Sequence, residues 1–126
     1  MATSGEYITI PGLVAATTFA SKQFYAAKFA STAGQVIPVT GITDACIGVV
    51  QNDPAVGEAA EVAALGVAKA AVEASVSAGN HLGLSTTGRL RATSADNTAE
   101  IAIALEGATT SAGDIIKVLL KGLGRY

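Results

Sequence analysis

Residues 112–121 read Ala-Gly-Asp-Ile-Ile-Lys-Val-Leu-Leu-Lys, and this stretch decides the fold class. A Gly followed by an acidic residue is typical of a tight turn that needs positive φ. The residues after it, from Ile115 to Leu120, are apolar except for Lys117 and rich in β-branched side chains. This order predicts a turn that leads directly into a β-strand over residues 115–121.

The same phrase, a small residue and then Gly and a polar residue, stands before three other apolar segments. Each copy predicts a turn that enters a strand. The spacings between the four Gly residues are 23, 22 and 34 positions, which is too irregular for a solenoid. The four copies are Ala33-Gly34-Gln35, Val56-Gly57-Glu58, Ala78-Gly79-Asn80 and Ala112-Gly113-Asp114.

Two of these phrases belong to a longer internal match, in which residues 47–67 run in step with residues 103–123 without a gap. Gly57 then faces Gly113, and Val62 faces Val118. The repeated unit reads strand, turn, strand. We therefore expect two similar hairpins.

The match also bears on residues 58–76, whose many Ala residues favour a helix. Their charges fit one face of a helix and nearly fit one face of a strand. Gly66 disfavours a helix, and the matched segment 115–120 is rich in β-branched residues. A strand is therefore predicted over residues 58–76.

Further short apolar segments are separated by turn signals such as Asn52-Asp53-Pro54 and Thr86-Thr87-Gly88. Many short strands at close spacing predict a mainly β fold, a small single-domain β-barrel or β-sandwich. The additional predicted strands cover residues 23–30, 35–39, 47–51, 80–85, 89–93 and 101–105.

The first 21 residues differ from the rest of the chain. Tyr7-Ile8-Thr9-Ile10 alternates as a strand does, Pro11-Gly12 turns the chain, and residues 13–21 are uncharged. The sequence predicts an extended N-terminal arm over residues 1–21 and a β-rich domain over residues 22–126. The arm would lie on a partner, with Tyr7, Ile8, Ile10 and Pro11 in contact. The open alternative is that residues 7–10 form the first strand of the domain's own sheet.

Composition limits the partners and the compartment. The chain has 126 residues, is 50% hydrophobic but only 5% aromatic, and carries a net charge of −2. No run of Lys or Arg could neutralise several phosphates, so nucleic acid is not an expected partner. No apolar run reaches membrane-spanning length, and no signal sequence opens the chain, so folding in the cytoplasm is expected. An Ala-rich core offers little area to bury, which favours an oligomer or lattice component.

The inventory of catalytic groups is small. His81 is the one His and Cys46 the one Cys, so neither a disulfide nor a Cys/His zinc cluster is expected. No nucleophile elbow or phosphate-binding loop appears. Glu58 and Asp114 lack the alternating acidic ladder of a calcium loop. The sequence predicts no enzyme, no metal and no cofactor, with Cys46 as a small buried hydrophobic residue.

Three segments resemble the small cement proteins of tailed phages. They are Val56-Gly57-Glu58 leading to Gly66-Val67-Ala68-Lys69, then Ala78-Gly79-Asn80 to Gly88, then Ile103-Ala104 to Leu120 with the Gly113-Asp114 turn. Ile47-Gly48-Val49-Val50 fits an early strand of that family, and the resemblance covers about residues 23–121. Where the family usually has an aromatic residue in the second hairpin, this chain has His81 and Leu82.

The resemblance implies a β-rich capsid decoration protein, often a homotrimer, that stabilises the phage head. Such a protein binds the exterior of the virion and bridges neighbouring copies of the major capsid protein. The competing interpretation is a phage tail, spike or other surface-binding module that recognises glycans. Glycan sites usually present exposed aromatic faces, and this chain has no Trp and six aromatic residues.

Overall fold

The computed structural model describes residues 7–42, 44–92, 99–107 and 114–125, and every regular element among them is a strand. The predicted mainly β fold is confirmed. Each predicted strand is present, including the disputed one within residues 58–76, and one short strand, β2, is additional. The strands are β1 Tyr7–Ile10, β2 Val14–Ala15, β3 Ala26–Phe29, β4 Gln35–Pro38, β5 Cys46–Val50, β6 Val62–Val72, β7 His81–Leu84, β8 Leu90–Ala92, β9 Ala99–Ala104 and β10 Asp114–Arg125.

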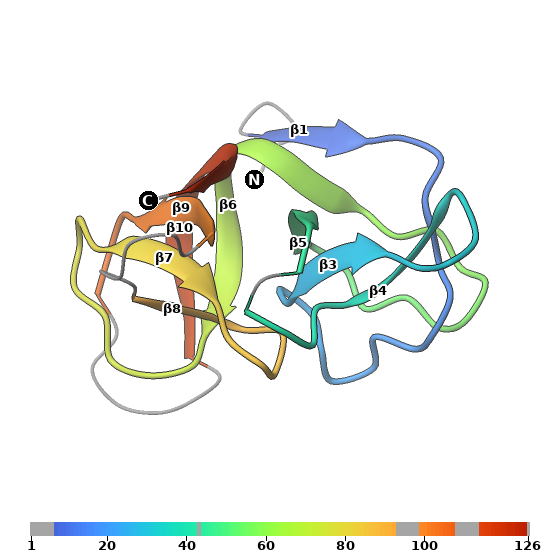
Figure 1. Ribbon diagram of the computed structural model, residues 1–126, viewed down its shortest axis with the longest axis horizontal. Coiled ribbons are helices and arrows are strands. Elements are labelled where there is room, and N and C mark those ends of the chain that lie inside the picture. Colours follow the sequence, from blue (N-terminus) through green and yellow to red (C-terminus); the bar gives the residue numbers. More distant parts are fainter. Residues whose placement is uncertain (1–6, 43, 93–98, 108–113, 126) are drawn as a thin grey trace.

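Five of these strands close into a small barrel in the order β6, β8, β7, β9, β10, with β10 pairing back onto β6. The barrel is mixed, because β6 and β8 run parallel while the other neighbours are antiparallel. The remaining strands extend from β6 through β5, β3 and β4 to β2, and β1 pairs with β6. Figure 1 shows the barrel strands on the left, β3 and β4 on the right, and β6 between them.

Strand β10 shows how the sequence pattern builds the barrel. Ile116, Val118 and Leu120 are buried inside, whereas Ile115 and Leu119 alternate with them and face outward. Because successive side chains of a strand point to opposite faces, the odd-numbered positions of β10 form one outer row. The stretch at residues 112–121 thus supplies both the barrel lining and part of its surface.

The structure has two adjoining hydrophobic cores, in keeping with the barrel and its extension. The first fills the barrel with side chains such as Leu82 and Leu84 and continues to β5 with Val49. The second lies under the strands beside it and includes Phe19, which is fully buried. Tyr7 and Phe24 pack against the first core from its border.

The two matched hairpins are both present, as β5 with β6 and β9 with β10. In the first hairpin, Val62 pairs with Val50. In the second, the matching residue Val118 pairs with Ala104, although the residue that matches Val50 is Glu106. The hairpins therefore share a shape but differ in register. Gly34, Gly57 and Gly79 have the positive φ predicted for their turns, and Gly113 lies outside the described residues.

The described part of residues 1–21 packs onto the rest of its own chain, whereas the sequence predicts an extended arm that lies on a partner. Strand β1 pairs antiparallel with β6 of its own chain, and Leu13, Ala15 and Phe19 are buried in the second core. These apolar side chains find a hydrophobic surface in their own chain, so burial there is favourable. The alternative left open by the sequence, a strand of the domain's own sheet, describes residues 7–10 in this structure.

Candidate interaction surface

The outer side of β6 and β10 carries exposed apolar side chains. Leu119 lies opposite Val67 and Ile115 opposite Ala71 in the antiparallel pairing, while Leu65 lies opposite Lys121. Leu65, Ile115 and Leu119 are 44%, 49% and 38% exposed. Directly opposed residues of antiparallel strands share a face, so these side chains form one surface.

Neighbouring strands widen this surface. Ile8 on β1 is opposite Leu65 and is 64% exposed. Leu105, just after β9, is 45% exposed and its N–H donates to the carbonyl of Lys117. Five of the eight exposed large hydrophobic side chains of the described residues therefore gather here. We call this surface the barrel face: Ile8, Leu65, Val67, Lys69, Leu105, Ile115, Lys117 and Leu119.

Two lysines stand side by side on the barrel face. Lys69 of β6 and Lys117 of β10 are directly opposite each other, and both are exposed. Within the described residues, neither ammonium group forms an ion pair with a carboxylate. Directly opposed like charges destabilise a sheet. This pair is therefore a feature that the fold alone does not explain.

A hollow of about 200 Å³ adjoins the lysine pair, and both lysines line it together with other polar and apolar groups. The Gln51 side chain holds one wall, because its amide group bonds both the N–H and the carbonyl of Lys69 at 3.3 and 3.0 Å. The other lining residues are Tyr7, Phe24, Val67 and Ala68.

The four predicted contact residues separate in the structure. Ile8 lies on the barrel face, and Tyr7 lines the hollow while its hydroxyl donates to Glu61 at 2.5 Å. Ile10 is half-buried against the second core, and Pro11 is exposed in the following turn. The sequence did not predict the opposed lysines, because a strand pattern shows which residues share a face but not which strand lies alongside.

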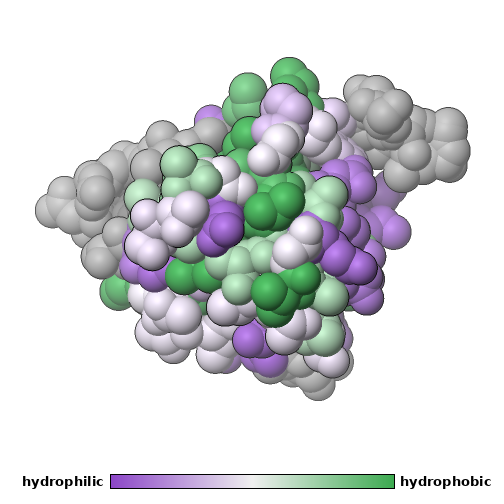
Figure 2. Space-filling model, turned by 90° about the vertical axis from the view of Figure 1, so that its right-hand side faces the viewer, coloured by the Kyte–Doolittle hydropathy of each residue, from purple (hydrophilic) through white to green (hydrophobic). Residues whose placement is uncertain are grey.

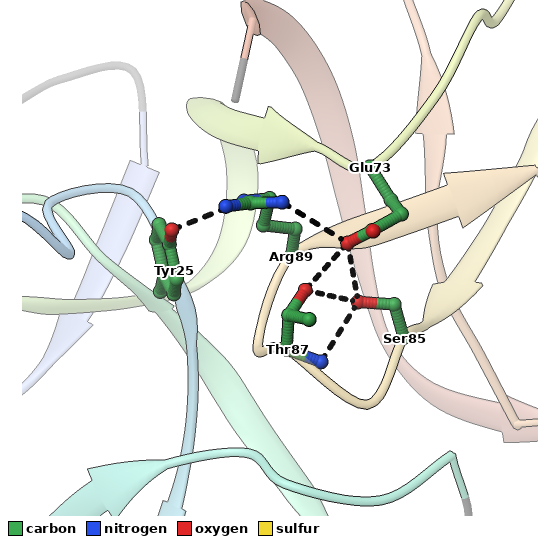
Figure 3. A network of polar contacts seen from close by, with 5 residues as sticks. All are labelled: Tyr25, Glu73, Ser85, Thr87 and Arg89. Atoms are coloured by element: carbon green, nitrogen blue, oxygen red, sulfur yellow. Dashed lines mark hydrogen bonds and ion pairs between the residues drawn. The ribbon is translucent and has the colours of Figure 1, made fainter. Parts of the chain in front are cut away.

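A polar network joins the barrel to the strands beside it (Figure 3). The Glu73 carboxylate accepts hydrogen bonds from the hydroxyls of Thr87 and Ser85 at 2.5 and 3.2 Å. Arg89 completes the network by bridging Glu73 to the hydroxyl of Tyr25. The bonds from Thr87, and then from Ser85 and Arg89, hold the pKa of Glu73 below its ordinary value of 4.5. Every polar group of the network has a hydrogen-bond partner within the fold, so we interpret the network as a structural junction.

The single His also has a structural partner. Glu100 is 5% exposed and its carboxylate contacts both His81 and the ammonium group of Lys121. Burial opposes the charge of Glu100, but the hydrogen bonds from Lys121 and His81 outweigh it and hold the pKa below 4.5. This arrangement is an ion cluster on the barrel wall.

Cys46 is buried, as predicted, and burial raises the pKa of its thiol to about 11. A thiol in such surroundings stays protonated near neutral pH and is a poor nucleophile. Across the described ranges, no group of three or more His, Cys, Asp or Glu side chains is placed to hold a metal ion. In that same part of the chain, no helix could cross a membrane.

The end of the molecule away from the barrel has a different character. It is formed by the end of β3 and by the loop between β5 and β6. Phe29 is the last residue of β3 and Val56 lies in that loop, and they are 51% and 64% exposed. Figure 2 views this end and shows hydrophobic side chains near its centre, with hydrophilic ones mainly at the right and others at the left and bottom. Glu58 of the same loop is an exposed carboxylate. Asp53, which is also exposed, lies elsewhere, because it lines a hollow with Ala71 and Ile115 at the edge of the barrel face.

The described residues form exposed surfaces and no recognisable catalytic site, and comparison with known proteins explains this. The family model described as phage cement protein matches residues 13–120. The chain belongs to the phage cement protein family. These are structural, non-enzymatic proteins, which confirms the resemblance and the prediction that this chain is not an enzyme. As a cement protein, it is associated with the head of the virion.

A solved structure supports the fold of this cement protein. The chain is similar to the head fiber gp8.5 N base of bacteriophage phi29, with a TM-score of 0.63 and 14% sequence identity. The similarity covers 86% of this chain and 90% of the other. At this identity the likeness concerns the fold alone. A search of curated proteins found no match.

Proposed function

We propose that this cement protein binds the outer surface of a phage capsid and bridges neighbouring copies of the major capsid protein. It thereby stabilises the expanded shell. The observation that carries the proposal is the barrel face, where five large hydrophobic side chains are exposed together on adjacent strands. Exposed apolar groups gathered in this way mark a protein interaction site. Membership of the cement family supports the capsid as the partner.

The energetics favour a protein that works in many copies. Burial of apolar surface contributes about 25 cal/mol per Å², so a face of this kind adds affinity when covered by a partner. We propose that the protein self-associates as a homotrimer, because linked copies raise the effective concentration of each capsid contact. The far end, with Phe29 and Val56, offers a separate apolar surface for such self-association.

Strand β1 contributes to the capsid contact in this proposal. Ile8 and Pro11 are exposed and available to a partner. Tyr7 and Ile10 anchor the strand instead, by packing on the first and second cores. We therefore assign the direct contact to Ile8 and Pro11 and the positioning of β1 to Tyr7 and Ile10. Recognition of glycans has less support, because Phe29 is the one aromatic residue in the exposed class among those described.

Cosedimentation with expanded empty capsids that lack the protein tests the proposal. We expect saturable binding at a fixed number of copies per capsid, with no binding to a glycan array. Because a partner that binds only the folded state stabilises it, the bound protein should also melt at a higher temperature than the free protein. Binding to glycans without binding to capsids would refute the proposal and favour the surface-binding alternative.

A further inference from the structure

We propose that the hollow beside Lys69 and Lys117 receives a carboxylate side chain of the capsid protein. This inference rests on the proposed function and names the chemistry of the contact. The partner residue is an Asp or Glu flanked by apolar groups, since exposed aliphatic side chains surround the lysine pair. The two ammonium groups would share the carboxylate while the surrounding leucines and isoleucines become buried.

The lysine pair indicates the charge of the partner. Lys69 and Lys117 are opposed across β6 and β10, and the described residues place no carboxylate in ion-pair contact with either of them. Their repulsion disfavours the isolated protein. A carboxylate between them would replace that repulsion by two attractions, and desolvation by the apolar surroundings would strengthen both.

The hollow has a defined shape before any partner arrives. Gln51 is tied to both backbone groups of Lys69, and Gln23 Nε2 donates to the Gln51 carbonyl at 2.9 Å. Phe24 holds a φ of 70°, which side-chain-bearing residues rarely adopt. Its carbonyl accepts from the N–H of Ala71 at 2.9 Å and its N–H donates to the Val50 carbonyl at 2.8 Å. A wall that is ordered before binding lowers the entropic cost of binding.

The size of the surroundings favours a macromolecule. The hollow measures about 200 Å³, which is smaller than a typical drug-sized pocket of about 300–1,000 Å³. The exposed aliphatic groups around it come from β1, β6 and β10 and from Leu105 after β9. One inserted side chain with a flat protein surface behind it fits this geometry.

Continuity with the proposed contact favours the capsid over a second copy of the chain. Ile8, which we assign to the capsid contact, lies on the same face as the lysines, so the hollow continues that surface.

Charge reversal at each lysine separates binding from folding. Lys69→Glu and Lys117→Glu each place a carboxylate opposite the remaining lysine, so the free protein should melt at the same temperature or higher. Both variants should nevertheless bind expanded capsids at least about tenfold more weakly than the unaltered protein. Arg91→Glu makes the same charge change on β8, another wall of the barrel, and should leave the affinity within about twofold.

Salt dependence and oligomeric state complete the test. Added salt should weaken capsid binding of the unaltered protein more than that of either lysine variant, since screening acts on the contact that the variants lack. Capsid affinities equal to that of Arg91→Glu would overturn the inference. So would a change of oligomeric mass with capsid affinity retained, because the lysines would then face a second copy. If the unaltered protein did not bind capsids at all, the proposed function itself would fail.

Discussion

Arg89 Nε donates a hydrogen bond of 3.0 Å to the hydroxyl of Tyr25, and this bond joins the barrel to the strands beside it. The same guanidinium lies 5.6 Å from the centre of the Tyr25 ring and reaches Glu73 at 3.3 Å. Tyr25 directly precedes β3, and Arg89 directly precedes β8. The barrel and the strands beside it are therefore held together by one charged side chain as well as by the shared strand β6.

Removing the Tyr25 hydroxyl should weaken this junction. Tyr25→Phe keeps the ring and takes away the acceptor of a partly buried, charged donor, so we expect a loss of about 1 kcal/mol in the free energy of unfolding. Urea denaturation followed by circular dichroism measures it. Tyr7→Phe is the matched control, because its hydroxyl bonds Glu61 at an exposed position and should matter less. Equal losses in the two variants would argue against a special role for the junction.

Gly48 allows β5 to approach β6 closely. An added Cβ would lie 2.2 Å from the carbonyl oxygen of Ala63, a backbone atom that cannot move aside cheaply. Gly48→Ala should therefore cost about 3 kcal/mol or more and lower the melting temperature sharply.

Gly57→Ala provides the comparison for that variant. Gly57 has a φ of 84°, but nothing lies within 4 Å of an added Cβ, so only backbone strain of about 1–2 kcal/mol is expected. A Gly48→Ala protein as stable as Gly57→Ala would show that the β5–β6 spacing can relax.

Acid should destabilise the protein partly through Glu100. Its pKa is held below 4.5 in the folded state, so its carboxylate stabilises the fold above the unfolded-state pKa. That contribution is lost as the pH falls through the folded-state pKa. Asp44 and Glu73 have pKa values shifted in the same direction, mainly by hydrogen bonds from Lys28 and Thr87 respectively.

Glu100→Gln should reduce this pH dependence. The variant loses the carboxylate charge that contacts Lys121 and His81, so we expect the free energy of unfolding to be about 1 kcal/mol lower at pH 7. We also expect stability to decline less steeply below about pH 4.5. Melting temperatures measured from pH 7 to pH 3 give both quantities. A decline as steep as that of the unaltered protein would assign the acid sensitivity to Asp44 and Glu73.

Ile8→Asp tests the contribution of β1 to capsid binding. Ile8 is 64% exposed, so the substitution should change the melting temperature of the free protein little. It places a charge in the apolar contact, and capsid affinity should fall about tenfold. Ile42→Asp is the matched control, because Ile42 is also an exposed aliphatic residue, at 39%, but lies off the barrel face beside Glu73 and Arg91. A fall in capsid affinity with Ile42→Asp alone would move the contact to that side of the molecule.

The sequence alone determined the strands, the turns and the family. The alternation in β10 shows which of its side chains line the barrel, because successive strand residues must face opposite sides. The turn positions of Gly34, Gly57 and Gly79 followed from a conformation that Gly adopts without a steric penalty. The high Ala content of β6 favours a helix, but the match of this segment to β10 predicts a strand, and the structure confirms the strand.

Only the tertiary structure decided which residues meet. Lys69 and Lys117 are 48 positions apart, and Ile8 and Leu65 are 57 positions apart, yet each pair is directly opposed in the sheet. A period of two assigns a side chain to a face but carries no information on the neighbouring strand or its register. Residues 7–21 pack on the domain for the same reason, since β4 and β6, the strands that receive them, are distant in the chain and are brought to them only by folding.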